Sequence, residues 1–69
     1  MKSKKLAAAF IATYGPTEAH ARVLNTEDNF RWLLQRRGED DPDVHTTLIA
    51  ISFWHTLRLN IELLTEEVN

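Results

Sequence analysis

Three histidines are the side chains of this chain best suited to chemistry. His45 and His55 lie ten residues apart in one predicted helix, which separates them by about three turns. One chain therefore cannot bring both to the same metal ion, and the sequence has no HExxH pair that would place two ligands one turn apart. His20 stands alone, and we expect it at the surface. The sequence predicts no metal site.

The acidic run Glu39–Asp43 is the other candidate for a cation site. A calcium loop needs spaced oxygen ligands, a central glycine and a distal glutamate, and this run has none of that pattern. Helix capping explains it better, with Asp41 as the N-cap, Pro42 at the first helical position and Asp43 beside the positive end of the helix dipole.

Acid–base and thiol chemistry find no support either. The three glutamates near the C-terminus resemble a solvated helix end, and paired carboxylates carry no acid–base role without a cleft; they are Glu62, Glu66 and Glu67. The absence of cysteine excludes disulfides and thiolate metal sites. We therefore predict a non-enzymatic protein with no catalytic residue, no cofactor and no metal.

Length and composition predict one domain over residues 1–69 and favour self-association. A chain of 69 residues buries only about 60% of the surface that its unfolded form exposes, so a further source of stability is expected. Without disulfides or a metal, oligomerisation is the remaining source. The net charge of −2 is not that of a typical nucleic-acid-binding domain, which is strongly basic.

The N-terminus resembles a secretory signal only superficially. Three lysines precede the apolar run Leu6–Ala12, but seven residues are the minimum for such a run. An alanine-rich helix is the simpler interpretation, because alanine is the best helix former. No apolar run approaches the 18 residues of a membrane span. We expect a cytoplasmic protein without membrane contact, and secretion is the alternative.

Spacing and capping residues predict four helices. A strand is the alternative for the first, since Phe10, Ala12 and Tyr14 alternate with Ile11 and Thr13, although three consecutive alanines argue against it. Gly15 with Pro16, Asn25 with Thr26, and Gly38 are the expected boundaries. The expected helices are Ser3–Tyr14, Pro16–Leu24, Asn25–Arg37 and Val44–Val68.

The long C-terminal helix has two apolar stripes at helical spacing. The main stripe is expected in the core and contains Ala50, Phe53, Trp54, Leu57, Ile61, Leu64 and Val68. The second stripe is weaker, and its polar members favour an interface over an obligate core. We therefore predict that it forms a homodimer contact through Leu48, Ser52, His55, Leu59 and Leu63.

Residues 20–34, HARVLNTEDNFRWLL, resemble a helix-turn-helix pattern. Ala21 and Asn25 match its spacing from a small residue to a turn, and a helix capped at Thr26 would carry residue types that reach bases or phosphates, namely Arg31, Gln35 and Arg36. Glu27 and Asp28 in its leading turn would repel phosphate. Two helices joined by a capped turn, without DNA binding, is the simpler interpretation.

The sequence therefore predicts an all-α, small four-helix domain, with three shorter helices packed around a long C-terminal one. We expect a homodimeric interaction protein, a regulator or inhibitor that contacts another protein, and the alternative is a dimeric helix-turn-helix regulator that binds DNA. Trp32 either faces solvent between arginines or folds back on residues 3–14. In size and composition the chain is similar to phage and plasmid accessory proteins. The predicted partner contacts are Arg31, Trp32, Arg36 and Arg37.

Overall fold

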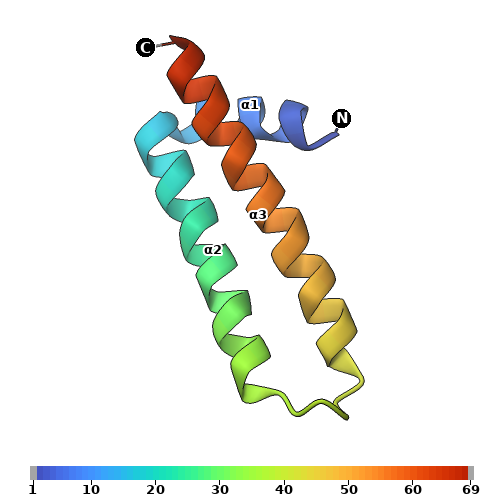
Figure 1. The fold of residues 1–69 in the computed structure, drawn as a ribbon. Coiled ribbons are helices and arrows are strands. Elements are labelled where there is room, and N and C mark those ends of the chain that lie inside the picture. The colour runs from blue at the N-terminus through green and yellow to red at the C-terminus, as the bar shows by residue number, and fades with distance from the viewer. Residues whose placement is uncertain (1, 69) are drawn as a thin grey trace.

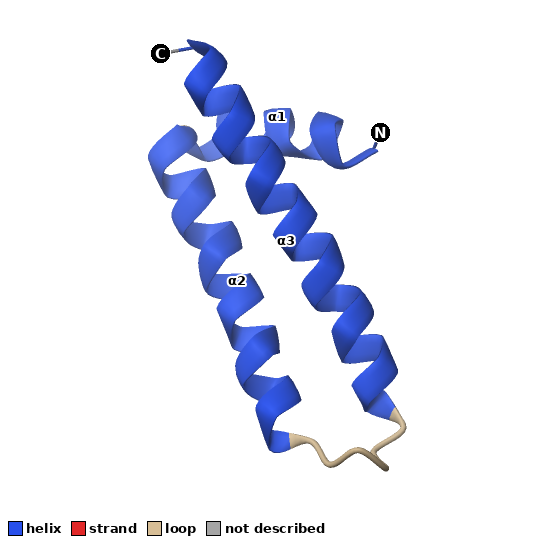
Figure 2. Cartoon of the chain, in the orientation of Figure 1, coloured by secondary structure: helices blue, strands red, loops and turns tan. Residues whose placement is uncertain are grey.

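A computed structural model describes residues 2–68, with only the backbone of Val68. Within this range the chain forms three helices and no strand: α1 (Lys2–Tyr14), α2 (Pro16–Arg36) and α3 (Asp43–Val68) (Figure 2). The all-α class and the long C-terminal helix are confirmed. The prediction of four helices is wrong, and so is that of three short helices around a long one.

The two long helices form an antiparallel hairpin, and α1 crosses one end of it (Figure 1). Helix α1 contacts both α2 and α3, and its N-terminal end extends past α3 on the side away from α2 (Figure 1). The molecule is elongated, with principal extents of 44 × 22 × 17 Å. The half of the hairpin near the α2–α3 connection therefore consists of two helices without a third.

Helix α1 ends where the chain reverses at Gly15. This glycine has a φ of 83°, a left-handed conformation that costs glycine little because it has no Cβ. Its N–H donates to the carbonyl of Ile11 at 2.8 Å, and Pro16 opens α2 at a position that needs no N–H. The predicted boundary is confirmed, and the strand alternative for residues 3–14 is wrong.

Helix α2 is continuous through Asn25 and Thr26, where the sequence predicted a break. The Thr26 hydroxyl donates to the carbonyl of Arg22 at 2.9 Å, a bond to the preceding turn that lets threonine remain inside a helix. Continuity places Ala19, Val23 and Glu27, four residues apart, on the buried face of one helix. Packing of this face outweighs the local capping preference of Asn25 and Thr26.

The connection between α2 and α3 is held by Arg37 and two aspartates. The Arg37 guanidinium donates to Asp41 at 3.1 Å and to Asp43 at 3.3 Å. The Asp41 carboxylate also accepts the N–H of Asp43 at 2.8 Å, as an N-capping side chain does. The predicted capping role of Asp41 is confirmed, and Arg37, predicted to bind a partner, stabilises this loop.

The core lies where α1 covers the hairpin. Its fully buried residues are Ala7, Ala19, Val23, Leu57 and Ile61. The two alanines let the helix backbones approach closely at the crossing. The core positions predicted at Leu57 and Ile61 are confirmed, and Trp54 and Leu64 pack at the edge.

One residue of the main stripe of α3, Phe53, departs from the prediction, whereas Ala50 is half-buried. Phe53 is 44% exposed, whereas Ile51 and Thr47 are buried. Thr47 and Ile51 lie in the half of the hairpin that only α2 covers, so they are buried between the two long helices, whereas Phe53 lines an open groove beside Lys2 and Ser3 of α1. The side chain of Val68 lies outside the described residues.

Candidate interaction surfaces

A polar cluster joins the two long helices, and Glu27 is its centre. The Glu27 side chain is 3% exposed. It accepts hydrogen bonds from Arg58 Nε at 2.7 Å, from Arg31 Nη2 at 2.8 Å and Nε at 3.0 Å, and contacts His55 Nδ1 at 3.1 Å. Charge-assisted bonds of this kind compensate the loss of hydration of a buried carboxylate. Sequence reasoning placed Glu27 in the first turn of a helix and missed this role.

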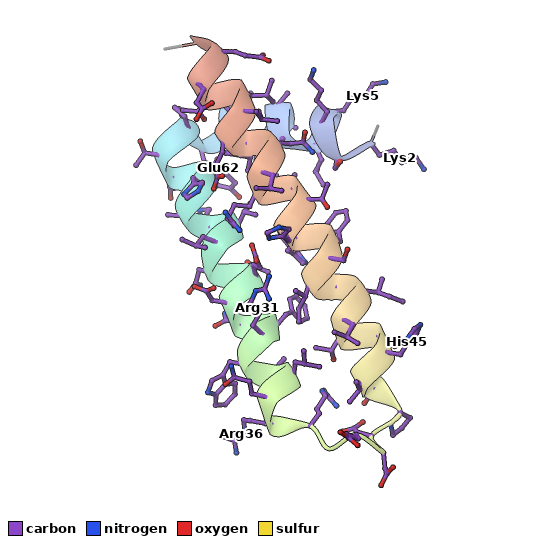
Figure 3. All side chains as sticks on the ribbon, viewed as in Figure 1. Lys2, Lys5, Arg31, Arg36, His45 and Glu62 are labelled. Atoms are coloured by element: carbon purple, nitrogen blue, oxygen red, sulfur yellow. The ribbon has the colours of Figure 1, made fainter. Side chains whose placement is uncertain are left out.

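Arg58 extends the cluster to Glu62 and His20. Arg58 Nη1 donates to Glu62 Oε2 at 2.7 Å, and His20 Nε2 lies 2.8 Å from the same oxygen. Glu62 and Arg31 of this cluster are labelled in Figure 3. His20 lies at the surface as expected, with 36% of its side chain exposed, but it pairs with Glu62. Of the three glutamates predicted for a solvated helix end, Glu66 and Glu67 are exposed, whereas Glu62 belongs to the polar cluster.

The cluster holds its carboxylates ionised. Burial alone would raise the pKa of Glu27, but the hydrogen bonds from Arg58, Arg31 and His55 together outweigh burial and lower this pKa to about 2. The hydrogen bond from His20, followed by that from Arg58, lowers the pKa of Glu62 despite burial. The hydrogen bonds to Glu27 and Glu62 raise the pKa of Arg58.

The arrangement of these side chains suits a structural role, in which charged groups join α2 to α3. A general acid or base needs a pKa near the working pH and access to a substrate proton, and Glu27 has neither. Within residues 2–68, no group of three His, Asp or Glu side chains is placed to hold a metal ion. The cluster therefore joins α2 to α3 through charged hydrogen bonds.

The four residues predicted to contact a partner differ in what they contact within the chain. Trp32 is 54% exposed, and the Arg36 guanidinium lies over its ring at 4.6 Å, close enough for a cation–π contact. This pair faces solvent, which decides between the two alternatives for Trp32. Arg31 is bound by Glu27 while 49% of its side chain stays exposed, and Arg37 is bound by the connecting aspartates. Trp32 and Arg36 are the two of the four that form no ion pair within the described residues.

The helix-turn-helix interpretation loses its turn in the structure. Helix α2 runs from Pro16 to Arg36 without interruption, so residues 20–34 cannot place a second helix at an angle to the first. Arg31, proposed for that recognition helix, is paired with Glu27. The match of Ala21 and Asn25 to the motif reflects local sequence alone.

The side of α3 opposite α2 carries most of the second apolar stripe. Leu48, Leu59 and Leu63 are 42–57% exposed and Ser52 is exposed, as an interface requires. The His55 side chain is also 41% exposed, although its Nδ1 contacts Glu27 at 3.1 Å. The sequence prediction also missed Ile49, which is 59% exposed on this side.

We call this surface the outer face of α3. It consists of His45, Leu48, Ile49, Ser52, Phe53, Thr56, Leu59 and Leu63. None of these residues carries a carboxylate, an ammonium or a guanidinium group. Part of this face forms an open groove of about 480 Å³ with the N-terminal end of α1. The groove is lined by Lys2, Ser3, Ile49, Ser52, Phe53 and Thr56.

No helix among the described residues is long and apolar enough to cross a membrane. Comparisons with protein-family models, with curated proteins and with solved structures found no match for this chain.

Proposed function

We propose that this chain is a small non-enzymatic interaction protein that acts as a regulator or inhibitor by presenting helical faces to other proteins. The observation that supports this most is the outer face of α3. Of the ten large hydrophobic side chains that are more than one third exposed among the described residues, five belong to this face. Contiguous exposed apolar surface of this kind is typical of protein-binding sites.

The Trp32–Arg36 pair offers a second contact, on α2. Tryptophan and arginine are the residue types most enriched among those that dominate binding energy at interfaces. Figure 3 shows Arg36 near the end of α2 that leads into the connecting loop (Figure 3). A partner that covers the indole ring would exclude water from the cation–π contact and so strengthen it. We assign the contact with a different protein to this pair.

Affinity capture from the native host tests this function. We expect a protein partner whose recovery falls at least about 10-fold on Trp32→Ala, as for a residue that dominates an interface, and falls less on Arg36→Ala. Arg22→Ala is the matched control, because Arg22 also lies over an aromatic ring, that of Tyr14 at 4.2 Å.

Equal recovery with all variants would contradict the role of this pair. A nuclease-sensitive partner would contradict the proposed class and favour the DNA-binding alternative. In that case, binding to DNA should weaken steeply with salt.

A further inference from the structure

We infer that the outer face of α3 binds the same face of a second copy of this chain, with the two helices antiparallel and the two-fold axis beside residue 54. This inference rests on the proposed function and names one partner of the interaction protein. Four observations support it: the size of the exposed surface, the spacing along α3, the charges at its C-terminal end, and the pairs that the antiparallel register creates.

The chain exposes more surface than a compact monomer of its mass. Its accessible surface is 5052 Å² for a mass of 8.0 kDa, whereas a compact monomer of that mass exposes about 4,450 Å². The excess of about 600 Å² is close to the about 800 Å² that each partner buries in a stable complex. A second copy on this side of the hairpin would remove such an excess.

The outer face contains a seam with the spacing of a coiled coil. His45, Ile49, Ser52, Thr56, Leu59 and Leu63 follow one another at intervals of 4, 3, 4, 3 and 4 residues. This alternation places side chains along one line where another helix can pack at a shallow angle. The small side chains of Ser52 and Thr56 at the middle of the seam permit close approach of the two helices.

Charge decides the orientation of the two helices. Glu66 continues the seam three residues after Leu63, and it is exposed. In a parallel pair Glu66 would face its own copy, and like charges opposite one another are destabilising. An antiparallel pair moves the two Glu66 side chains to opposite ends of a seam about 27 Å long and opposes the two helix dipoles.

The antiparallel register leaves no seam residue without a partner. The seam is symmetric about residue 54. Each seam residue therefore faces the residue of the second copy that lies equally far from residue 54 on the other side, so the two residue numbers sum to 108. Ile49 then packs against Leu59 of the second copy, and His45 packs against its Leu63. Ser52 faces Thr56 near the axis, where their hydroxyls can hydrogen-bond to each other.

Single cysteines test the pairing directly, because the chain has none of its own. We expect that mixed Ile49→Cys and Leu59→Cys proteins form a disulfide-linked dimer under mild oxidation, while neither protein does so alone. Two positions ten residues apart along antiparallel helices are about 15 Å from each other, too far for a disulfide. Leu33→Cys on α2 replaces Ile49→Cys in the matched control mixture, which should stay uncrosslinked.

Two results of this experiment would overturn the inference. Cross-linking of Ile49→Cys with itself would show a parallel pair, and no cross-link in any mixture would show that the face does not bind a second copy. All of these positions are exposed, so the variants retain the core.

A charge placed on the seam gives an independent measurement. We expect Leu59→Glu to reduce the molar mass in solution from that of a dimer to 8.0 kDa, and Leu33→Glu, an equally drastic change on α2, to leave the dimer intact. Circular dichroism verifies that both variants stay helical. If Leu59→Glu unfolds, the cross-linking of Ile49→Cys with Leu59→Cys still tests the antiparallel pairing.

The two proposals can fail separately. A monomeric chain that loses its partner on Trp32→Ala would overturn the dimer alone. A cross-linked dimer that captures the same proteins with and without Trp32 would overturn the assigned partner contact alone.

Discussion

Arg58 of α3 donates a 2.7 Å hydrogen bond from Nε to Oε1 of Glu27 on α2, at the middle of the polar cluster between the long helices. Glu27 lies one turn beyond Val23 and two turns beyond Ala19 on the buried face of α2. The polar cluster therefore continues the buried face of α2 from the apolar core toward the half of the hairpin that α1 does not cover. It fixes the relative position of two helices that α1 joins only at one end.

Acid should destabilise this protein through Glu27. The pKa of Glu27 is about 2 in the folded chain against 4.5 as its ordinary value. Because the folded pKa is the lower one, its contribution is fully present above pH 4.5 and is lost as the pH falls toward 2. The loss amounts to about 3 kcal/mol of unfolding free energy, and the lowered pKa of Glu62 acts in the same direction.

Urea unfolding at fixed protein concentration, followed by circular dichroism between pH 6 and 2.5, measures this loss. Glu27→Gln should flatten the profile, and a wild-type profile that is already flat would contradict the ionised cluster.

Removing Arg58 should cost far more than removing an exposed arginine. Arg58→Met leaves Glu27 buried with fewer donors, and breaking a buried ion pair costs about 3 kcal/mol. Arg22→Met is the matched control, because Arg22 and Glu18 form a pair that is more than half exposed on both sides, worth about 0–1 kcal/mol. Equal effects in a urea titration would show that the cluster does not clamp the helices.

Asn25→Ala tests the continuity of α2 by the sign of its effect. Asn25 is exposed in the interior of the helix, where alanine is the better helix former by about 0.5 kcal/mol. We therefore expect a small stabilisation. A destabilisation of about 1 kcal/mol would instead show that Asn25 caps a separate helix.

Two alanines of α1, Ala7 and Ala9, should respond differently to enlargement. Ala7 is fully buried at the crossing, whereas Ala9 is exposed. Ala7→Leu should destabilise the chain by about 1–3 kcal/mol by overpacking, and Ala9→Leu should change stability by less than about 0.5 kcal/mol. Thermal unfolding of both variants measures the difference, and a neutral Ala7→Leu would contradict the packing of α1 on the hairpin.

The sequence predicted the helices whose ends depend on local chemistry. Gly15 with Pro16 and the Asp41 cap mark boundaries that the structure retains, because turn and capping preferences act within a few residues. Asn25 and Thr26 carry the same local preferences, yet α2 passes through them. Only the packing of Val23 and Glu27 on α3 explains this difference, and such long-range contacts are not visible in a single sequence.

The polar cluster shows the same limit. Arg58 lies 31 residues after Glu27 and 4 residues before Glu62 in the sequence. The contact between Arg58 and Glu27 therefore depends on how the two long helices are aligned in the hairpin. The apolar spacing of Leu48, Leu59 and Leu63, by contrast, is a property of one helix, and their exposure agrees with the expected surface. His55 shares this spacing but is drawn to Glu27, a contact that the pattern could not reveal.

Sedimentation equilibrium of the unmodified protein tests the central claim most directly. We predict a molar mass twice the 8.0 kDa of the chain at micromolar concentration, with the Leu59→Glu variant at the mass of one chain and Leu33→Glu still at twice that mass. A mass of 8.0 kDa for the unmodified protein up to high micromolar concentration would contradict the account.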